Sequence, residues 1–257
     1  MPPKYAAFAF VLLSWVVAWA PDLEAGQRRF TFVYESTTSS KGEVELENWA
    51  TWKNGRESGN QVEFRHEIEY GVTDRFQASL YVANWEVNDS KAGGDEGAHA
   101  AFQDSAVELI YGLSNPVKDI LGSALYGEFK AGPKHFELEG KLILQKNFGP
   151  IVVAYNAILE SEWEGEEDGL YNEQKGAFEQ SFGVSYQFNP YFLVGGELLH
   201  EIEFPEWSDA NDSIVCIGPN ASLRYKRFWL TTTILLQVTG ISDEPDLQLR
   251  TIFGVEL

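Results

Sequence analysis

The sequence predicts an all-β protein, a transmembrane antiparallel up-and-down β-barrel of about twelve strands preceded by a cleavable signal peptide. Three observations predict this fold. From residue 43 onwards, segments of about ten residues alternate apolar and polar side chains, as strands with two different faces do. Short and longer connections alternate between these segments, and aromatic residues gather beside the short ones. After the N-terminal region no apolar run approaches roughly 18 residues, so no helical span is expected.

The first 25 residues have the three parts of a secretory signal peptide. A short basic start ends at Lys4, an apolar core runs from Tyr5 to Ala20, and a polar exit follows. The core of about 16 residues is shorter than the roughly 20 residues that a helical span needs. We expect cleavage near Ala25. The stretch Ala18-Trp19-Ala20 offers a second small-x-small site, and an uncleaved anchor is the alternative interpretation.

Residues 26–42 form an N-terminal segment before the predicted barrel, which spans residues 43–257. Within this segment RRFTFVYEST, from Arg28 to Thr37, also alternates like a strand. It would be an extra strand, pairing at the periplasmic rim. The pattern leaves two alternatives open, in which the segment occupies the lumen or stays in the periplasm.

The barrel strands are predicted from alternation at period 2. In residues 61–70, Val62 and Phe64 share one face while Glu63 and Glu67 share the other. The same two-faced pattern recurs to the end of the chain, and an even strand number is typical of outer-membrane barrels. The predicted strands are residues 43–53, 61–70, 76–83, 107–113, 125–131, 136–144, 153–160, 181–188, 194–204, 215–225, 228–238 and 247–257.

The connections distinguish a membrane barrel from a secreted soluble β-domain, in which the apolar faces would meet in a core. Membrane barrels have short periplasmic turns and longer extracellular loops. Residues 71–75 and 189–190 are short connections, whereas 162–176 is long and contains the acidic run EWEGEEDG. The short connection at 132–133 breaks the alternation. The two ends of the structure should therefore differ in length and charge, which a soluble sandwich does not require.

Aromatic residues beside the short turns indicate a membrane interface. Rings at one level on successive strands form the girdle that flanks the apolar band of such barrels. The candidate interface aromatics are Tyr70, Phe76, Phe188, Tyr191, Tyr225 and Phe228.

Four stretches resemble porin- and transporter-like outer-membrane β-barrels of Gram-negative bacteria: KGEVELENW, EYGVTDRFQASLYV, VSYQFNPYFLVGGEL and the terminal LRTIFGVEL. The resemblance covers nearly all of the chain after the signal peptide. It implies a location in the cell outer membrane, contact with lipid and lipopolysaccharide, and insertion by the barrel-insertion machinery. The chain departs from the pattern at Leu257, where such barrels often end in a Phe that this machinery recognises.

If the apolar faces meet lipid, the charged faces line the lumen. A mainly acidic lumen favours small polar or cationic solutes, as carboxylate rings do in cation pores. A barrel whose side chains plug it, with a structural or adhesive role, is the alternative. The candidate lumen residues are Glu63, Arg65, Glu67, Glu69, Glu137, Glu139, Lys141, Glu197, Glu201, Arg224 and Arg250.

Composition and motifs exclude several other functions. The formal net charge of −20 disfavours nucleic acid as a partner. A single cysteine, Cys216, allows no intrachain disulfide. The sequence contains no nucleophile elbow, phosphate loop or zinc-ligand spacing, so we expect no enzymatic activity, no cofactor and no metal site. A barrel hydrolase remains a weaker alternative. The acidic loops are expected at most to share divalent cations with lipopolysaccharide phosphates.

Overall fold

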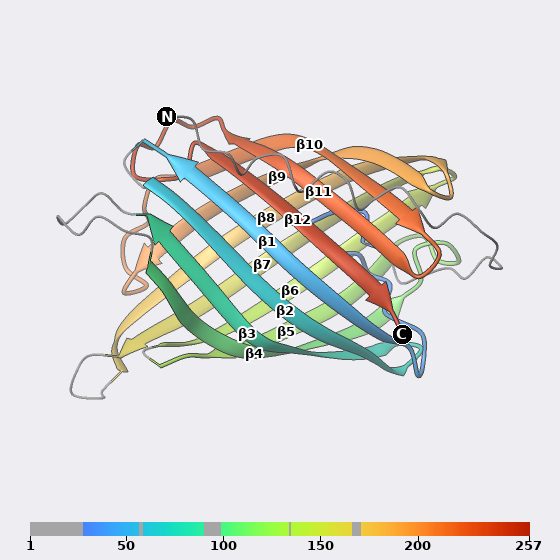
Figure 1. The fold of residues 1–257 in the computed structure, drawn as a ribbon, viewed down its shortest axis with the longest axis horizontal. Coiled ribbons are helices and arrows are strands. Elements are labelled where there is room, and N and C mark those ends of the chain that lie inside the picture. The colour runs from blue at the N-terminus through green and yellow to red at the C-terminus, as the bar shows by residue number, and fades with distance from the viewer. Residues whose placement is uncertain (1–27, 57–58, 90–98, 134, 166–170) are drawn as a thin grey trace, which may run out of the picture.

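The structure, a computed structural model, describes residues 28–56, 59–89, 99–133, 135–165 and 171–257. In these ranges twelve antiparallel strands form one closed barrel, in which β1 pairs with β12 (Figure 1). The predicted fold class and strand number are confirmed. The predicted signal peptide lies outside the described residues. The strands are β1 (Val44–Gly55), β2 (Gly59–Thr73), β3 (Phe76–Asp89), β4 (His99–Ser114), β5 (Gly122–Ala131), β6 (His135–Phe148), β7 (Ile151–Gly165), β8 (Tyr171–Asn189), β9 (Phe192–Pro205), β10 (Ile214–Tyr225), β11 (Phe228–Gln237) and β12 (Leu247–Glu256).

None of the described residues belongs to a helix that is long and apolar enough to cross a membrane.

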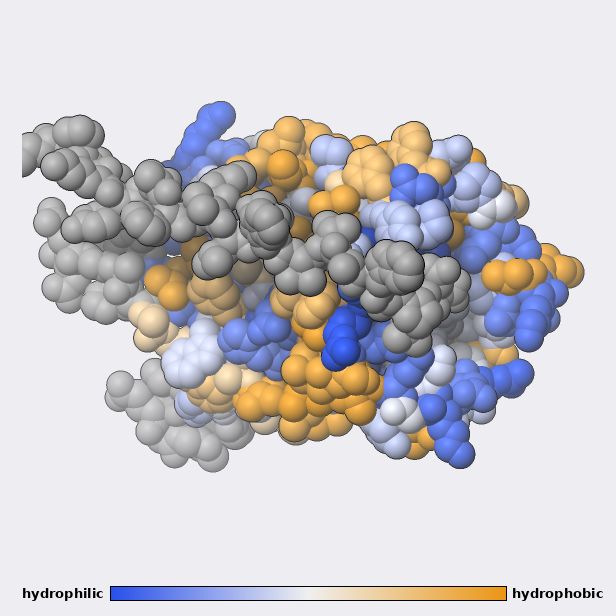
Figure 2. Space-filling model, turned by 45° about the vertical axis from the view of Figure 1, so that its right-hand side comes forward, coloured by the Kyte–Doolittle hydropathy of each residue, from blue (hydrophilic) through white to orange (hydrophobic). Residues whose placement is uncertain are grey.

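Strand pairing turns the alternating sequence into two different barrel surfaces. In β1 and β2, Glu47 pairs with Glu67, and Leu46 pairs with Ile68. Both carboxylates are 2% exposed because they point inward, whereas Ile68 is 41% exposed on the outside. Figure 2 shows hydrophobic side chains gathered across the lower middle of one outer face and hydrophilic ones at its right-hand end. An apolar outer surface of this extent is suited to lipid, and the soluble alternative is not supported.

A β-bulge changes the alternation in β3. The pairing of β3 with β4 shifts between Tyr81 and Trp85. Tyr81 and Asn84 therefore both point inward, at 0% and 7% exposure, although three positions separate them. The predicted alternation of residues 76–83 holds up to Tyr81 and is broken by the bulge after it.

The two ends of the barrel differ as the sequence predicts. Two-residue turns such as 149–150 and 226–227 lie at the end where β12 finishes, together with the longer β4–β5 connection at 115–121. The opposite end has the long connections at 90–98, 206–213 and 238–246, and also the short ones at 56–58 and 132–134. Beside the short turns, Phe188 and Tyr191 are 60% and 56% exposed on the outer surface. Tyr70, Tyr225 and Phe228 are exposed as well, and Phe76 is half-buried. Their role as an interface girdle remains a prediction.

Residues 28–40, here called the plug segment, lie inside the barrel up to Ser36 and reach its rim with the exposed Thr37 and Ser40 (Figure 1, the blue chain before β1). The predicted extra strand does not form, because residues 28–43 adopt no strand. The physical reason is that β1 already pairs with β12, so the closed sheet offers no free edge. Phe30, Thr31 and Val33 are at most 2% exposed, so the segment fills much of the interior. The lumen is therefore occupied, which was one of the sequence alternatives.

Candidate functional site: the occupied lumen

The structure places all the predicted lumen residues on inward faces, but it does not bring them into one site. Glu67, Glu69 and Arg65 line the β1–β4 side, together with the inward carboxylates of neighbouring strands. Glu197 on β9 and Arg250 on β12, which is the neighbour of β1, also contact the plug segment. The remaining predicted residues are Glu63 on β2, Glu137, Glu139 and Lys141 on β6, Glu201 on β9 and Arg224 on β10.

Glu197 holds the middle of the plug segment. Its carboxylate accepts the backbone N–H groups of Thr31, Phe32 and Val33 at 2.9, 2.7 and 3.0 Å. The Thr233 hydroxyl donates a further bond at 2.5 Å. Glu197 is only 1% exposed, and hydrogen bonds from several donors are what a buried carboxylate needs. Three consecutive amides on one carboxylate fix the backbone of the segment at this point.

Two wall amides extend this attachment toward the short-turn end. Asn156 accepts from the Tyr34 backbone N–H at 2.7 Å and donates to the Tyr34 carbonyl at 3.0 Å. Gln145 accepts from the Ser36 N–H at 2.7 Å. These side chains supply the bonds that a neighbouring strand would otherwise provide, which satisfies the buried backbone groups of the segment.

Apolar side chains of the plug segment fit recesses in the wall. Phe30 packs against Val152 and Ala154 on β7. Phe32 packs against Cys216 and Leu235, whose side chains point inward from β10 and β11. Both rings are buried in these contacts, at 0% and 9% exposure.

Arg28 at the start of the segment lies in a cage of aromatic rings and carboxylates. Its Nε is 3.1 Å from Glu47 Oε1, and its Nη2 is 4.0 Å from Glu67 Oε2. The guanidinium carbon is 4.3 Å from the Tyr34 ring centroid and 4.6 Å from that of Trp49. Planar cations are bound in this way by ring faces and carboxylates together.

Other lumen charges are paired across the wall. Arg65 contacts Glu128 at 2.5 Å and stacks over the Tyr81 ring at 3.8 Å. Lys130 contacts Glu137 at 2.5 Å. Such pairs offset much of the cost of placing charges in a narrow interior.

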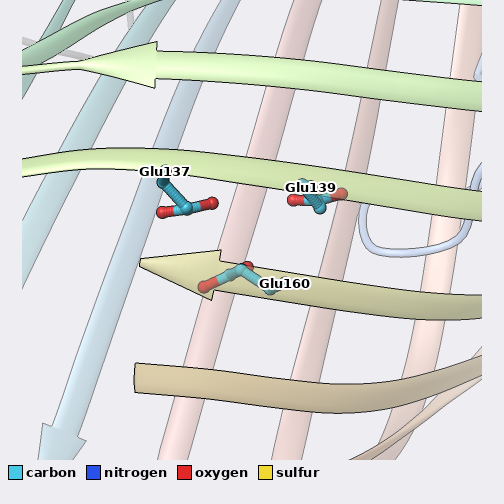
Figure 3. Close-up of side chains that lie close together, drawn as sticks. All are labelled: Glu137, Glu139 and Glu160. Atoms are coloured by element: carbon cyan, nitrogen blue, oxygen red, sulfur yellow. The ribbon is translucent and has the colours of Figure 1, made fainter. Parts of the chain in front are cut away.

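Three carboxylates on β6 and β7 approach one another closely. Glu160 points toward Glu137 and Glu139, and one oxygen of each lies within 4.8 Å of the others (Figure 3). Oxygen ligands at this spacing suit a hard divalent cation. However, Lys130 already contacts Glu137, and Lys141 contacts Glu139 at 2.5 Å. The two ammonium groups already pair with these carboxylates.

One Ser–His pair lies near the long-loop end. His200 Nε2 is 2.7 Å from Ser213 Oγ, and its Nδ1 is 3.2 Å from Gln180 Nε2. The Gln180 oxygen accepts from Tyr155 at 2.7 Å, so its amide nitrogen faces the imidazole. The hydrogen bond between His200 and Ser213 is exposed, and His200 lies on the face of β9 opposite to that of the inward Glu197. The pair is therefore outside the lumen.

Comparison with known proteins places this barrel in a family. A model described as "Family of unknown function (DUF6662)" matches residues 23–251. The chain belongs to that family. No curated protein gives a match. Among solved structures, the DUF6662 barrel is similar to the COG4313 outer membrane channel from Pseudomonas putida F1, with 13% identity and a TM-score of 0.61, over 86% of this chain and 98% of that one.

A second similar structure is the NanC porin, with 10% identity and a TM-score of 0.55. The match covers 82% of the DUF6662 chain and all of the porin chain. At these identities the similarity shows the fold alone. It confirms the architecture of an outer-membrane barrel.

Sequence reasoning missed the inward aromatic residues of the DUF6662 barrel. Trp49, Tyr126 and Trp229 point into the lumen and are at most 5% exposed. They surround the Tyr34 ring, whose centroid is 4.9 Å from that of Tyr126. The sequence did contain a sign of them, because these aromatic residues fall on the polar faces of strands whose side chains alternate. Large rings on inward faces need a partner to fill the interior, and the plug segment is that partner.

Proposed function

We propose that this DUF6662 protein is a porin-like outer-membrane channel for small polar or cationic solutes, closed at rest by the plug segment. One observation carries the proposal. The segment is attached through side chains of the wall such as Glu197 and Asn156, without strand pairing. Such bonds exchange with water when the segment moves, and the barrel stays closed meanwhile because its own ladder is complete. The names of the two similar structures, a channel and a porin, support this reading.

The charges around the plug segment favour cations. On the β1–β4 side the buried carboxylates include Glu45, Glu47, Glu67 and Glu69. Arg28 lies closest to them, and it belongs to the segment rather than to the wall. Withdrawal of the segment would leave this side of the lumen more negative, which attracts cations and repels anions.

We place the short-turn end in the periplasm and the long-loop end outside, following the rule for bacterial barrels. In this orientation the plug segment enters from the periplasm, since Gly42 N–H donates to the Gly71 carbonyl beside the β2–β3 turn. Lipopolysaccharide then contacts the long-loop end, and the barrel-insertion machinery acts on β12, the last strand.

A structural barrel with a permanent plug is the second candidate. The observation that favours it is the number of bonds at a single wall residue, Glu197. We assign no catalytic role to the pair of His200 and Ser213, because its hydrogen bond is exposed on the outer side of the barrel, away from the lumen.

Planar-bilayer recordings on a cross-linkable variant test the proposal. Phe32→Cys places a thiol in the cluster that contains Cys216, so a short bis-thiol-reactive linker can join the segment to β10. We expect cation-selective current from the uncoupled variant and loss of that current after coupling. A linker cleaved by a reductant should restore the current.

The matched control is Phe32→Cys combined with Cys216→Ser, which cannot be cross-linked. Current that persists unchanged after verified coupling would show that passage does not need the segment to move. If the coupled, uncoupled and control proteins all give no current, and heat-dependent gel migration shows that each is folded, the permanent plug is favoured.

A further inference from the structure

We infer that the lumen wall contains a binding site for a guanidinium group, that Arg28 occupies this site as a tethered internal ligand, and that solutes bearing a guanidinium compete for it. The inference rests on the proposed function and names a substrate class for it. It starts from the contacts of one side chain. Arg28 belongs to the plug segment, whereas Trp49, Glu47 and Glu67 belong to β1 and β2.

The wall part of the site is arranged in advance of the cation. Trp49 Nε1 donates to Glu47 Oε2 at 2.8 Å, which leaves Glu47 Oε1 to receive the Arg28 Nε–H at 3.1 Å. The same bond orients the indole, whose face lies against the guanidinium. A carboxylate beside an aromatic face recognises a flat, weakly hydrated cation better than a compact ammonium.

Glu67 provides an independent sign of a ligand site. Its side chain is fully buried, and neither carboxylate oxygen has a hydrogen-bond partner among the described residues. The hydroxyls of Ser79 and Tyr81 also lie close to Glu67, but each has one proton and donates it to Glu108, at 3.4 and 3.0 Å. The Arg28 Nη2 at 4.0 Å is close enough to attract Glu67 but too far for a hydrogen bond. Arg28 therefore satisfies the site only in part, and a ligand free of the tether can approach Glu67 more closely.

A path to the site exists beside the plug segment. A cavity of about 220 Å³ is lined by Arg28, Tyr34 and the carboxylates of Glu45, Glu47 and Glu69. It extends along the segment to Ser39 and Ser40 at the short-turn end. This volume holds several water molecules, so a small cation can reach the guanidinium without passing through the wall.

The experiment uses the full chain with the substitution Arg28→Ala, which empties the site, and tests whether an added guanidinium compound replaces the missing side chain. Cys216 is the reporter, because this residue is 3% exposed and packs against Phe32, so we expect its thiol to react only after the segment moves. We expect R28A to speed the labelling of Cys216 by a polar thiol reagent. Because Tyr34 of the segment forms one face of the cage, methylguanidinium should bind best when the segment is in place. It should therefore lower the labelling rate of R28A, and the effect should saturate. Methylammonium and urea at equal concentration should act far more weakly.

The matched control is Arg29→Ala, which removes the same side chain from the next position. Arg29 pairs with Glu35 inside the segment at 2.6 Å, so R29A leaves the wall site filled. Methylguanidinium should not slow labelling in R29A. Adding Trp49→Leu or Glu67→Gln to R28A should abolish the rescue, with heat-dependent gel migration showing that each variant folds. Equal responses of R28A and R29A, or no saturable response of R28A, would overturn the site.

A swelling assay of vesicles containing the wild-type protein tests the solute class. Arginine amide should enter faster than methylamine-based cations of equal charge and similar size, and equal entry would overturn the preference. Labelling needs no ion flow. If methylguanidinium slows labelling of R28A but the bilayers show no current, the channel is contradicted and the guanidinium site is not. If the protein conducts but methylguanidinium does not slow labelling, the guanidinium site is contradicted and the channel is not.

Discussion

The backbone N–H of Phe32 donates a 2.7 Å hydrogen bond to the Glu197 carboxylate, across a sequence separation of 165 residues. The same carboxylate receives the amides on either side, from Thr31 and Val33. A carboxylate has the lone pairs to accept all of these donors, whereas a neutral amide has one oxygen. The charge of Glu197 is therefore central to the position of the plug segment.

Glu197→Gln should release the segment. The variant replaces an accepting oxygen by an N–H donor that faces backbone donors, and hydrogen bonds to charged groups contribute about 1.5–3 kcal/mol each. A loss of about 2 kcal/mol raises the withdrawn population more than tenfold at 1.4 kcal/mol per decade. The rate of Cys216 labelling measures this population. Glu201→Gln on the same strand is the control, because no hydrogen bond joins Glu201 to the described segment. Equal rates in the two variants would contradict the role of Glu197.

Gly183→Ala should displace the segment from the other side. A Cβ at this inward position of β8 would lie 2.7 Å from the Phe30 ring, closer than side chains approach one another. The ring is fully buried against Val152 and Ala154, so it has little space into which to move. We expect faster labelling of Cys216 and a lower thermal midpoint.

Gly140→Ala is the control for this substitution, because nothing lies within 4 Å of its Cβ position. A Gly183→Ala protein that labels no faster than the Gly140→Ala protein would show that the Phe30 recess adapts without moving the segment.

The strands were predictable because alternation is a local property. The two faces of a strand, such as those of Leu46 and Glu47 in β1, can be recognised within a few residues. Closure into a barrel is then expected, because every strand has one apolar face that needs lipid. The bulge at Asn84 was not predictable, since the inward phase of β3 changes there without any turn residue.

For the plug segment, the sequence left three alternatives open: an extra strand, a segment in the lumen and a segment in the periplasm. Alternation in Arg28–Thr37 is the same for a strand and for an extended segment whose two faces meet different parts of a lumen. The deciding contacts are long-range, because Asn156 and Tyr34 are separated by 122 positions. Local pattern carries no information on such pairs. The inward rings of Trp49 and Trp229 were the available sign that the interior is filled.

Leu142→Arg should test the lipid face. Leu142 lies near the middle of β6 and is 42% exposed on the outside. An arginine at the bilayer midplane costs a transmembrane barrel about 2–4 kcal/mol, whereas an exposed position in water costs almost nothing. We expect a loss in that range in the free energy of unfolding measured in phospholipid vesicles. Val117→Arg in the β4–β5 turn, 73% exposed, should be near neutral. Equal effects at the two positions would contradict the lipid-facing assignment.

Arg65→Met should destabilise the lumen through its partner Glu128. The pair is 2.5 Å apart, and the Glu128 side chain is 1% exposed. Removing the guanidinium leaves a buried carboxylate without its closest cation, which costs about 3 kcal/mol, at the low end of such cases because the Tyr126 hydroxyl still donates to it. Adding Glu128→Gln should recover most of the loss, since a neutral amide tolerates burial. Unfolding free energies of the two single variants and the double variant give the coupling energy directly. Additive losses would mean that the two residues act independently, and the cation stacking of Arg65 on Tyr81 would then account for its contribution.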